Sequence, residues 1–504
     1  MKLKKTYLIS GAVLVVLIGV FIARSMFSDS ETISEAEAQS MATYTDSPYG
    51  YELRYPKQMK VDKSLPGIRT RFSDETTQID VYYDDFNGTV SDAAAYMGYG
   101  NKFIENTKDH RVSKNETKKI GGRTVHLLKW ERDKLKHVEN DKPYYATAEI
   151  VKNDKEVYTI AIKSSQPITN DEKLVKLFRV IPPQGDKPAL GTVTKKLPLK
   201  TNQETAEVYR KLFMTDGLKW GIFEPTAPKR MDILHSLEQK LDYKFNTLIL
   251  YKSLNTEFPM EELKNAQNDN RLVELTMQTM RFGEPNPSVM YDILSGKYDE
   301  YFTKYAQGLK EFGHPLLFRL NNEMNGDWVP YSAYHYSKDP DLYNEVWKYI
   351  YRTFQNQGVD NLLWVWNPNH LDKPGFKWNH SLLYYPGDEF VDVVGLTAYN
   401  TGNYYPGEKW STFDELYAPL YADYTKWFEQ PLMITEFSSS SVGGDKAKWV
   451  DQMFKDIKKY PKLKAAIWWS HTDFDKDNRP ARKYKLDEAP ELIEQFRQHL
   501  KEYK

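Results

Sequence analysis

Two glutamates, Glu323 and Glu436, stand where a run of apolar residues gives way to polar ones. Glu323 lies in the segment RLNNEMNGDW at 319–328, and Glu436 lies in ITEFSSS at 434–440. Two carboxyl groups can cleave a glycosidic bond when one protonates the leaving oxygen and the other attacks the anomeric carbon, which requires a separation of about 5–5.5 Å. The two glutamates are therefore candidates for the catalytic pair of a retaining glycosidase.

Arg319 lies four residues before Glu323, on the same side of an extended strand. A nearby cation lowers the pKa of a carboxyl group, so Arg319 could hold Glu436 ionised and oriented. Asn322 lies on the opposite side under strict alternation. If Asn322 also faces the site, the strand must contain a bulge near its end.

The elements that must position these residues are strands that alternate with helices. Beyond residue 204 the sequence repeats an apolar strand, a loop and a helix. The eight strand candidates are 218–223, 245–250, 272–278, 316–322, 361–366, 391–398, 432–436 and 465–470. Eight such units in about 290 residues predict a (β/α)8 TIM barrel. A doubly wound sheet is the alternative, but the sequence has no GxGxxG turn.

Polar residues follow most of these strands, and catalytic groups of TIM barrels lie at the C-terminal ends of the strands. The residues in question are Glu224, Gln278, Asn322, Glu323, Asn367, Asn369, Tyr399, Asn400, Glu436, Ser470 and His471. The two candidate glutamates end strands four and seven, on opposite sides of a closed barrel. The pattern therefore predicts that both carboxyl groups point into one mouth.

Four segments together resemble glycoside hydrolase family 26: RLNNEMNGDW (319–328), VVGLTAYN (393–400), ITEFSSS (434–440) and AAIWWSHTDFD (465–475). The resemblance covers residues 215–500. It implies a retaining barrel with Glu323 as acid/base and Glu436 as nucleophile. It also implies that Trp328 stacks on a sugar, that Tyr399 bonds the nucleophile and that Trp468 is a platform on strand eight.

Three positions depart from the pattern of the family's mannanases, which carry His before the acid/base, His at the end of strand three and Asp before the strand-six tyrosine. This chain has Asn322, Gln278 and Thr397 there. The Asn-Glu pair is the more general form among related retaining barrels, so the departures bear on the substrate rather than on catalysis.

A smaller α+β domain is predicted at 43–182, before a Pro-, Gly- and Lys-rich linker at 183–203 and the barrel domain at 204–504. Its strand candidates are 49–56, 78–83, 123–130, 144–152 and 156–163, with helices near 90–97 and 171–178. Its opening strand weakly resembles that of small extracytoplasmic domains of the photosystem PsbP type. It contains no carboxylate pair, metal-ligand spacing or glycine loop, so we expect it to act as a spacer or to contact the cell wall.

The N-terminus combines Lys2, Lys4 and Lys5 with an apolar run over 7–23. Residues 1–27 are predicted to be a transmembrane anchor with the rest of the chain outside the cell. A cleaved signal peptide, which would make the protein secreted, is the alternative, although the residues after the run form a poor cleavage site. Residues 28–42 are polar and acidic, as in a flexible stalk.

Composition excludes several classes of function. There is no cysteine among the 504 residues, which rules out disulfides and thiolate metal sites. The formal net charge of -1 argues against a general nucleic-acid binder. Asp473, Asp475 and Asp477 resemble a calcium loop but lack its glycine and terminal glutamate. We expect neither a metal nor another cofactor.

The sequence therefore predicts an anchored endo-β-glycanase that acts by double displacement on a polysaccharide. Mannan is the first candidate substrate, and β-glucan, xylan or the cell's own exopolysaccharide are the others. Arg319, Asn322, Trp328, Tyr399, Trp468 and Gln278 are the predicted substrate-binding residues. A catalytically silent glycan-binding protein is the alternative function. A phosphate-handling barrel ranks below it, because strands seven and eight lack a glycine-rich phosphate loop.

Overall fold

The computed structural model describes residues 39–169 and 172–504. The predicted anchor at 1–27 and most of the stalk lie outside this range. Among the described residues, no helix is long and apolar enough to cross a membrane. The chain divides into two compact units. The first comprises the described part of Met1–Leu190 together with Ala333–Pro340 and Pro374–His380, and the second comprises Gly191–Ser332, Asp341–Lys373 and Ser381–Lys504.

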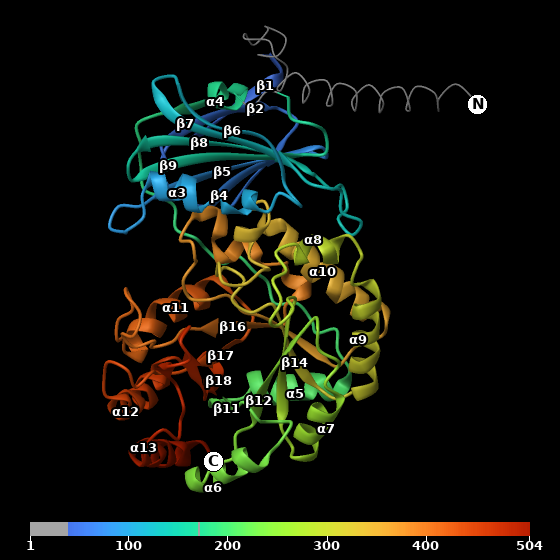
Figure 1. Ribbon diagram of the computed structural model, residues 1–504, viewed down its shortest axis with the longest axis vertical. Helices are drawn as coiled ribbons and strands as arrows, with labels where there is room; N and C mark the ends of the chain where they lie inside the picture. Colours follow the sequence, from blue (N-terminus) through green and yellow to red (C-terminus); the bar gives the residue numbers. More distant parts are fainter. Residues whose placement is uncertain (1–38, 170–171) are drawn as a thin grey trace, which may run out of the picture. The chain divides into compact units, whose positions relative to one another are not determined.

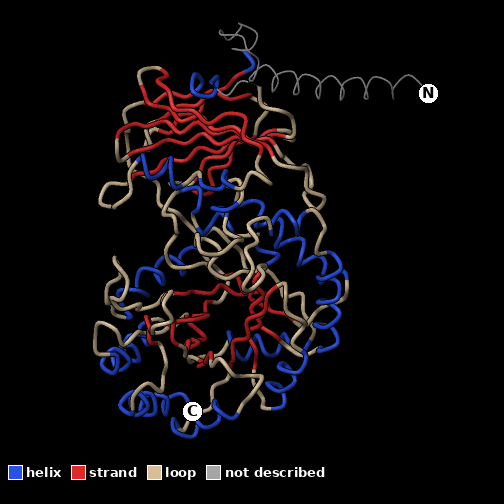
Figure 2. Tube along the Cα trace, in the orientation of Figure 1, coloured by secondary structure: helices blue, strands red, loops and turns tan. Residues whose placement is uncertain are grey.

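The second unit is a closed barrel of eight parallel strands in sequence order, with helices around it (Figures 1 and 2). The strands are β11 (Lys219–Phe223), β12 (Thr247–Ser253), β13 (Leu272–Gln278), β14 (Leu316–Leu320), β15 (Leu362–Trp366), β16 (Val393–Thr397), β17 (Leu432–Phe437) and β18 (Leu463–Trp469). Each predicted strand overlaps one of these. The TIM-barrel prediction is confirmed, and the doubly wound alternative is wrong because β11 pairs with β18 and closes the sheet.

Helices precede, connect and follow the strands of the barrel. They are α5 (Gln203–Phe213), α6 (Asp232–Leu241), α7 (Met260–Asn268), α8 (Val289–Leu294), α9 (Asp299–Phe312), α10 (Pro340–Asn356), α11 (Phe413–Trp427), α12 (Lys446–Asp456) and α13 (Pro490–Leu500). Local sequence explains their limits. Thr412 and Glu415 form a reciprocal capping box at the start of α11. Gly313 ends α9 with φ 69°, a conformation that favours glycine.

The interior of the barrel is filled by alternate residues of the strands. Ile249, Leu317, Val365 and Ile467 belong to one buried cluster, which also contains apolar residues of α5. Because side chains alternate along a strand, the residue two positions further along each strand faces the same way. Tyr251, Arg319 and Trp469 therefore follow this interior layer toward the C-terminal mouth.

The first unit is built mainly on antiparallel strands. A seven-stranded sheet has the order β3-β4-β5-β9-β8-β7-β6, and a three-stranded sheet has the order β1-β2-β10. The strands are β1 (Met41–Asp46), β2 (Tyr51–Pro56), β3 (Lys60–Leu65), β4 (Arg69–Ser73), β5 (Thr77–Asp85), β6 (Arg111–Ile120), β7 (Arg123–Glu131), β8 (Tyr144–Asn153), β9 (Glu156–Ser164) and β10 (Phe178–Val180). Helices α3 (Ala93–Tyr99) and α4 (Glu172–Leu177) complete the α+β unit.

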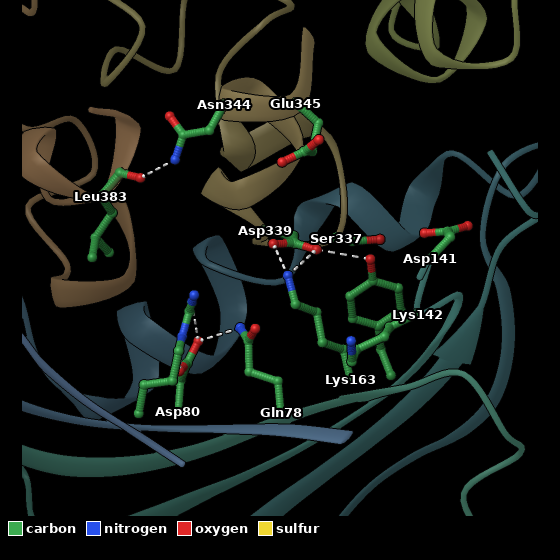
Figure 3. Close-up of polar contacts among 12 residues, drawn as sticks. Gln78, Asp80, Asp141, Lys142, Lys163, Ser337, Asp339, Asn344, Glu345 and Leu383 are labelled. Carbon is green, nitrogen blue, oxygen red and sulfur yellow. Dashed lines mark hydrogen bonds and ion pairs between the residues drawn. The ribbon is translucent and has the colours of Figure 1, made fainter. Parts of the chain in front are cut away.

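Two segments from the barrel region of the sequence are part of the first unit, which the sequence did not predict. Lys163 Nζ donates to both carboxylate oxygens of Asp339, at 2.8 and 3.1 Å (Figure 3). Lys338 Nζ lies 2.7 Å from Glu149 Oε1, and both side chains are almost fully buried. The peptide N–H of Lys377 donates to Asp84 at 2.7 Å. Paired charges and hydrogen bonds thus hold Ala333–Pro340 and Pro374–His380 in this unit.

Candidate active site

The turn after β14 presents Glu323 at the barrel mouth. The strand ends at Leu320, because Asn321 and Glu323 adopt φ 52° and 56° in the left-handed region. The peptide N–H of Glu323 donates to the Asn367 carbonyl at 2.7 Å. The Asn321 side chain accepts from the Thr279 peptide N–H at 2.7 Å. The prediction of a β-bulge at the end of this strand is therefore wrong. A left-handed turn at Asn321 and Glu323 orients these side chains instead.

Glu436 is turned toward the mouth by an irregularity in β17. The pairing of β17 with β18 shifts register between Ile434 and Phe437. Such a shift lets consecutive residues depart from strict alternation. The buried Glu436 carboxylate accepts a hydrogen bond from the Tyr251 hydroxyl. It also lies 3.4 Å from Arg319 Nη2, as the position of Arg319 before Glu323 had predicted.

Arg319 is fully buried and connects several strands of the barrel. Its Nη1 donates to Asn367 Oδ1 at 3.0 Å, and its Nη2 donates to the Tyr251 hydroxyl at 3.2 Å. Its Nε lies 2.9 Å from Thr276 Oγ1 and 2.7 Å from Glu274 Oε1. A guanidinium held by this many groups has one orientation, so the charge that it offers to Glu436 is fixed in place.

Glu323 has the electrostatics of a proton donor. Burial and, to a smaller extent, the charge of Glu436 raise its pKa to about 7, against lowering effects from the Asn369 amide and Arg319. Asn369 Nδ2 donates to Glu323 Oε1 at 2.5 Å. Two carboxyl groups whose surroundings differ in this way can take opposite roles in one reaction, one as acid and one as base or nucleophile.

Trp328 stands at the rim with half of its surface exposed. Its indole packs so closely on Gly326 that a Cβ there would lie 2.4 Å from the ring. Glycine at 326 therefore lets the indole settle over the turn that carries Glu323. An exposed aromatic face beside a carboxyl pair is a suitable surface for the C–H face of a sugar ring.

Two amides, Gln278 and Asn322, form a pair beside Glu323. Gln278 Nε2 donates to Asn322 Oδ1 at 3.0 Å and to the Tyr331 hydroxyl at 3.2 Å. The Tyr331 hydroxyl in turn donates to the Asn322 carbonyl at 2.9 Å. The two positions predicted to contact substrate are thus brought together, and each fixes the other.

The prediction for Trp468 is wrong. Trp468 is fully buried and packs against Trp449 of α12 and Phe496 of α13, with its Nε1 donating to the Tyr484 carbonyl. Trp469 has the inward parity of Ile467. It stacks on Phe223 at 5.2 Å and meets the Tyr399 ring edge-on at 6.2 Å.

Tyr399 does lie in this region, but another tyrosine bonds Glu436. Among the described residues, the hydroxyl that donates to Glu436 is that of Tyr251 on β12. Burial and the charge of Glu436 raise the pKa of both tyrosines well above their ordinary value, so both hydroxyls stay protonated. The prediction that Tyr399 bonds the nucleophile is therefore wrong, because Tyr251 makes this hydrogen bond.

Sequence reasoning missed Tyr251 and Glu274. The predicted second strand stopped at 250, although the alternation of Ile249 with Tyr251 was visible in the sequence. Glu274 sits fully buried within β13, where a charged residue in an apolar run gave no signal. Burial raises its pKa to about 7 even though Arg319 lowers it. A third carboxyl group thus lies on the far side of Arg319 from Glu436.

Residues 273–484 match the family model for glycosyl hydrolase family 26. This part of the barrel, about two fifths of the chain, is similar to that family. The match includes Glu323, Glu436 and the segments of strands four, six, seven and eight that carried the resemblance in sequence.

Two curated relatives and one solved structure illustrate the likeness. Endoglucanase H of Acetivibrio thermocellus is 27% identical over 288 residues, 56% of this chain and 30% of the relative. A mannan endo-1,4-beta-mannosidase of Bacillus subtilis is 30% identical over 178 residues, 33% of this chain and 43% of the relative. A solved Bacillus subtilis mannanase gives a TM-score of 0.40 at 21% identity, over 56% of this chain and 89% of that one. The chain spans less than half the length of these curated relatives.

Proposed function

We propose that the protein is a retaining endo-β-glycanase that hydrolyses a β-linked polysaccharide, with a mannan-like chain as the first candidate. The observation that carries the proposal is the pair of Glu323 and Glu436 at one barrel mouth, in unequal electrostatic surroundings. The match of residues 273–484 to glycosyl hydrolase family 26 supports the reaction class. The relatives named above as mannosidase and endoglucanase support a β-linked glycan of neutral sugars.

In the proposed reaction Glu323 is the general acid. Its raised pKa keeps a proton on the carboxyl group up to about pH 7, and that proton passes to the oxygen of the leaving sugar. Glu436 attacks the anomeric carbon and forms a glycosyl-enzyme ester. Glu323, now ionised, takes a proton from water, which attacks the ester and releases the sugar with its configuration retained.

Arg319 and Tyr251 orient Glu436 for this attack. The cation stands 3.4 Å from one oxygen, and the protonated hydroxyl of Tyr251 donates to the same oxygen. Oriented donors reduce the rearrangement needed in the transition state. The other carboxylate oxygen can then point toward the anomeric carbon.

The amide pair Gln278 and Asn322 bears on the choice of substrate. Amides present both donors and acceptors to sugar hydroxyls and do not titrate, unlike the histidines that the family's mannanases carry at these positions. We therefore expect the site to accept sugars whose hydroxyl groups are arranged differently from those of mannose. For this reason β-glucan, xylan and exopolysaccharide are tested beside mannan.

The test is digestion of a panel of mannan, glucomannan, β-glucan, xylan and exopolysaccharide, with products resolved by mass spectrometry. We expect oligosaccharides from at least one glycan. Glu436→Ala should lower the rate by about 10⁴-fold or more, since the nucleophile is removed. Glu284→Ala, which removes an exposed glutamate of the same unit, is the control and should keep full activity.

Two results would overturn the proposal. Full residual activity in Glu436→Ala would refute the assignment of the nucleophile. Tight binding of a glycan with no new reducing ends over days would instead identify a silent glycan-binding protein.

For location, we propose that residues 1–27 anchor the protein in the cell membrane with both described units outside. The basic start and apolar run at 7–23 support this. Membrane fractionation of the full chain should recover the protein in the membrane, and removal of residues 1–27 should release it. Recovery of a shortened chain in the medium would indicate a cleaved signal peptide.

A further inference from the structure

Asn325, two residues after Glu323, is a fully buried asparagine that the proposed reaction does not use. It lies in the turn after β14, in which the peptide N–H of Gly326 donates to the Glu323 carbonyl at 2.9 Å. A side-chain amide has two N–H donors and an acceptor oxygen, and a buried one must find partners for them inside the protein. The partners of Asn325 identify the segment that it holds.

The side chain of Asn325 bonds both polar groups of one peptide backbone residue. Asn325 Oδ1 accepts from the peptide N–H of Asn369 at 2.8 Å, and Asn325 Nδ2 donates to the Asn369 carbonyl at 3.0 Å. A residue in an antiparallel ladder exchanges the same two bonds with its partner. A side chain from the loop after β14 thus takes the place of a neighbouring strand for the loop after β15.

Further bonds fix the orientation of the Asn325 amide. Its Nδ2 also donates to Asp372 Oδ1 at 2.8 Å, and this oxygen accepts from the peptide N–H of Ser381 at 3.0 Å. The Asn325 carbonyl accepts from the peptide N–H of Lys373 at 2.8 Å. A flipped amide would set N–H against N–H and oxygen against oxygen. Asn325 therefore has one orientation, and it joins the two loops at several points.

The side chain of Asn369 is oriented as well. Its Oδ1 accepts from the peptide N–H of Leu371 at 2.9 Å, which leaves Nδ2 to donate to Glu323 Oε1 at 2.5 Å. A hydrogen bond weakens steeply when its length or angle changes. The bond to Glu323 therefore depends on the position of the Asn369 backbone, which Asn325 holds.

This bond affects the proton of Glu323. A donor favours the ionised form of a carboxyl group, so the Asn369 amide lowers the pKa of Glu323, against the larger raising effect of burial. In the proposed reaction Glu323 must give up its proton and then act as a base. The bond from Asn369 is strongest in the ionised state, in which Glu323 acts as that base.

Other groups also face Glu323. The charge of Glu436 raises its pKa and Arg319 lowers it. Residues of β12 and β13 hold Arg319 and Glu436, so both remain in place when Asn325 is replaced. Three tyrosines that interact with Glu323 stay protonated, because burial raises the pKa of each: Tyr331, Tyr399 and Tyr484.

We propose that Asn325 is a positioning residue for the acid/base, because its amide clamps the backbone of Asn369 so that the Asn369 side chain reaches Glu323. The inference rests on the proposed function of Glu323 as acid/base. It adds to the site a buried side chain that acts on the carboxyl group only through another residue.

The experiment is a pH titration of the Glu323 carboxyl group in the full chain by carbon-13 NMR, with its resonance identified by its loss in Glu323→Gln. Asn325→Ala should raise the midpoint by about 0.5 pH units, because the donor to the ionised form is displaced. Asn369→Ala, which removes that donor, should raise it by up to about one pH unit. The double variant should shift it no further than Asn369→Ala alone, since both changes remove the same bond.

Asn361→Ala is the matched control. Asn361 is almost fully buried just before β15, and its Nδ2 donates to the carbonyls of Leu309 and His314 at 3.1 and 2.8 Å. Its replacement should lower the thermal unfolding midpoint and leave the titration of Glu323 unchanged. Asn325→Ser, which can replace at most one of the lost bonds, should give a smaller upward shift, and it serves if Asn325→Ala gives no folded protein.

Two results would overturn the proposal. One is an unchanged Glu323 midpoint in both Asn325 variants. The other is a double variant in which the shifts of Asn325→Ala and Asn369→Ala add, since the two residues would then act separately. The NMR titration requires no turnover. The expected shifts in a protein that hydrolyses no glycan would uphold the clamp on Asn369 and refute the proposed reaction instead.

Discussion

Two clusters of buried charge show how one residue type can serve two purposes. In the barrel, Glu323, Glu436 and Glu274 outnumber their single cation, Arg319. In the first unit, Glu149 is enclosed by Lys338 at 2.7 Å and by His126 Nδ1 at 2.7 Å. Every carboxyl group in both clusters is at least partly buried. The two clusters differ in the number of cationic partners that each carboxyl group has.

The pKa shifts follow this difference. Burial raises the pKa of Glu323 and of Glu274 to about 7, and the partners do not offset it. Burial also raises the pKa of Glu149, but Lys338 and His126 outweigh it and bring the pKa below its ordinary value. The cluster in the barrel, called the unequal cluster because its carboxyl groups outnumber its cations, keeps a proton available for transfer. The cluster around Glu149, called the balanced cluster, keeps Glu149 ionised and holds the segment that carries Lys338 in place.

The largest expected effect comes from breaking the unequal cluster with Glu323→Ala. On an aryl β-glycoside with a good leaving group, the first step needs little acid, so the glycosyl-enzyme should accumulate. Its hydrolysis should slow by about 10²–10⁴-fold because the general base is missing. Azide should restore turnover and give a glycosyl azide, measured by chromatography. No azide rescue would argue against the acid/base role.

The second largest effect is expected from Lys338→Met, which breaks the balanced cluster. This leaves Glu149 buried without its main partner, and the free energy of unfolding should fall by about 3–5 kcal/mol, measured by denaturant titration at pH 7. Lys60→Met, at an exposed lysine of the same unit, is the control. Because the pKa of Glu149 is lowered, its stabilisation is present above its ordinary pKa and is lost as the pH falls through the lowered one.

Glu323→Gln in the barrel should have the opposite effect and stabilise the fold. A pKa raised to about 7 means that ionisation of Glu323 destabilises the fold as the pH rises above its ordinary value of 4.5. The variant should therefore unfold at a higher temperature than the wild type at pH 8, with a smaller difference at pH 5. A lower midpoint at pH 8 would contradict the assigned electrostatics.

The smallest effect is a shift of the pH profile by Asn369→Ala. The basic limb of kcat/KM should lie near pH 7, where Glu323 loses its proton. The Asn369 hydrogen bond lowers the pKa of Glu323, so its removal should move the limb upward by up to about one pH unit. Glu274→Gln is the control, because Glu274 has a similar pKa. Loss of the limb in that variant would assign it to Glu274.

The sequence predicted the barrel and its strand ends because apolar runs and helical periodicity are local signals. It also brought together Glu323, Glu436, Arg319 and the amide pair, since residues at strand ends meet at one mouth. The choice between Trp468 and Trp469 failed because strand eight was given no register. Counting parity from the buried Ile467 would have selected Trp469.

Other features depend on contacts that no local pattern records. Glu274 and Tyr251 matter because they lie beside Arg319 and Glu436 in the folded barrel. The left-handed turn at Asn321 rests on a hydrogen bond from the peptide N–H of Thr279, which follows β13. Likewise, Ala333–Pro340 joins the first unit through partners more than 170 residues away, such as Lys163.

Double displacement by Glu323 and Glu436 fixes the stereochemistry of the product. Proton NMR of the glycan that proves susceptible, recorded in the first minutes of hydrolysis, distinguishes the two anomers before they interconvert. Because two displacements restore the starting configuration, we expect the new reducing ends to appear first in the β configuration of the bond that was cleaved. Initial appearance of the α anomer would rule out double displacement.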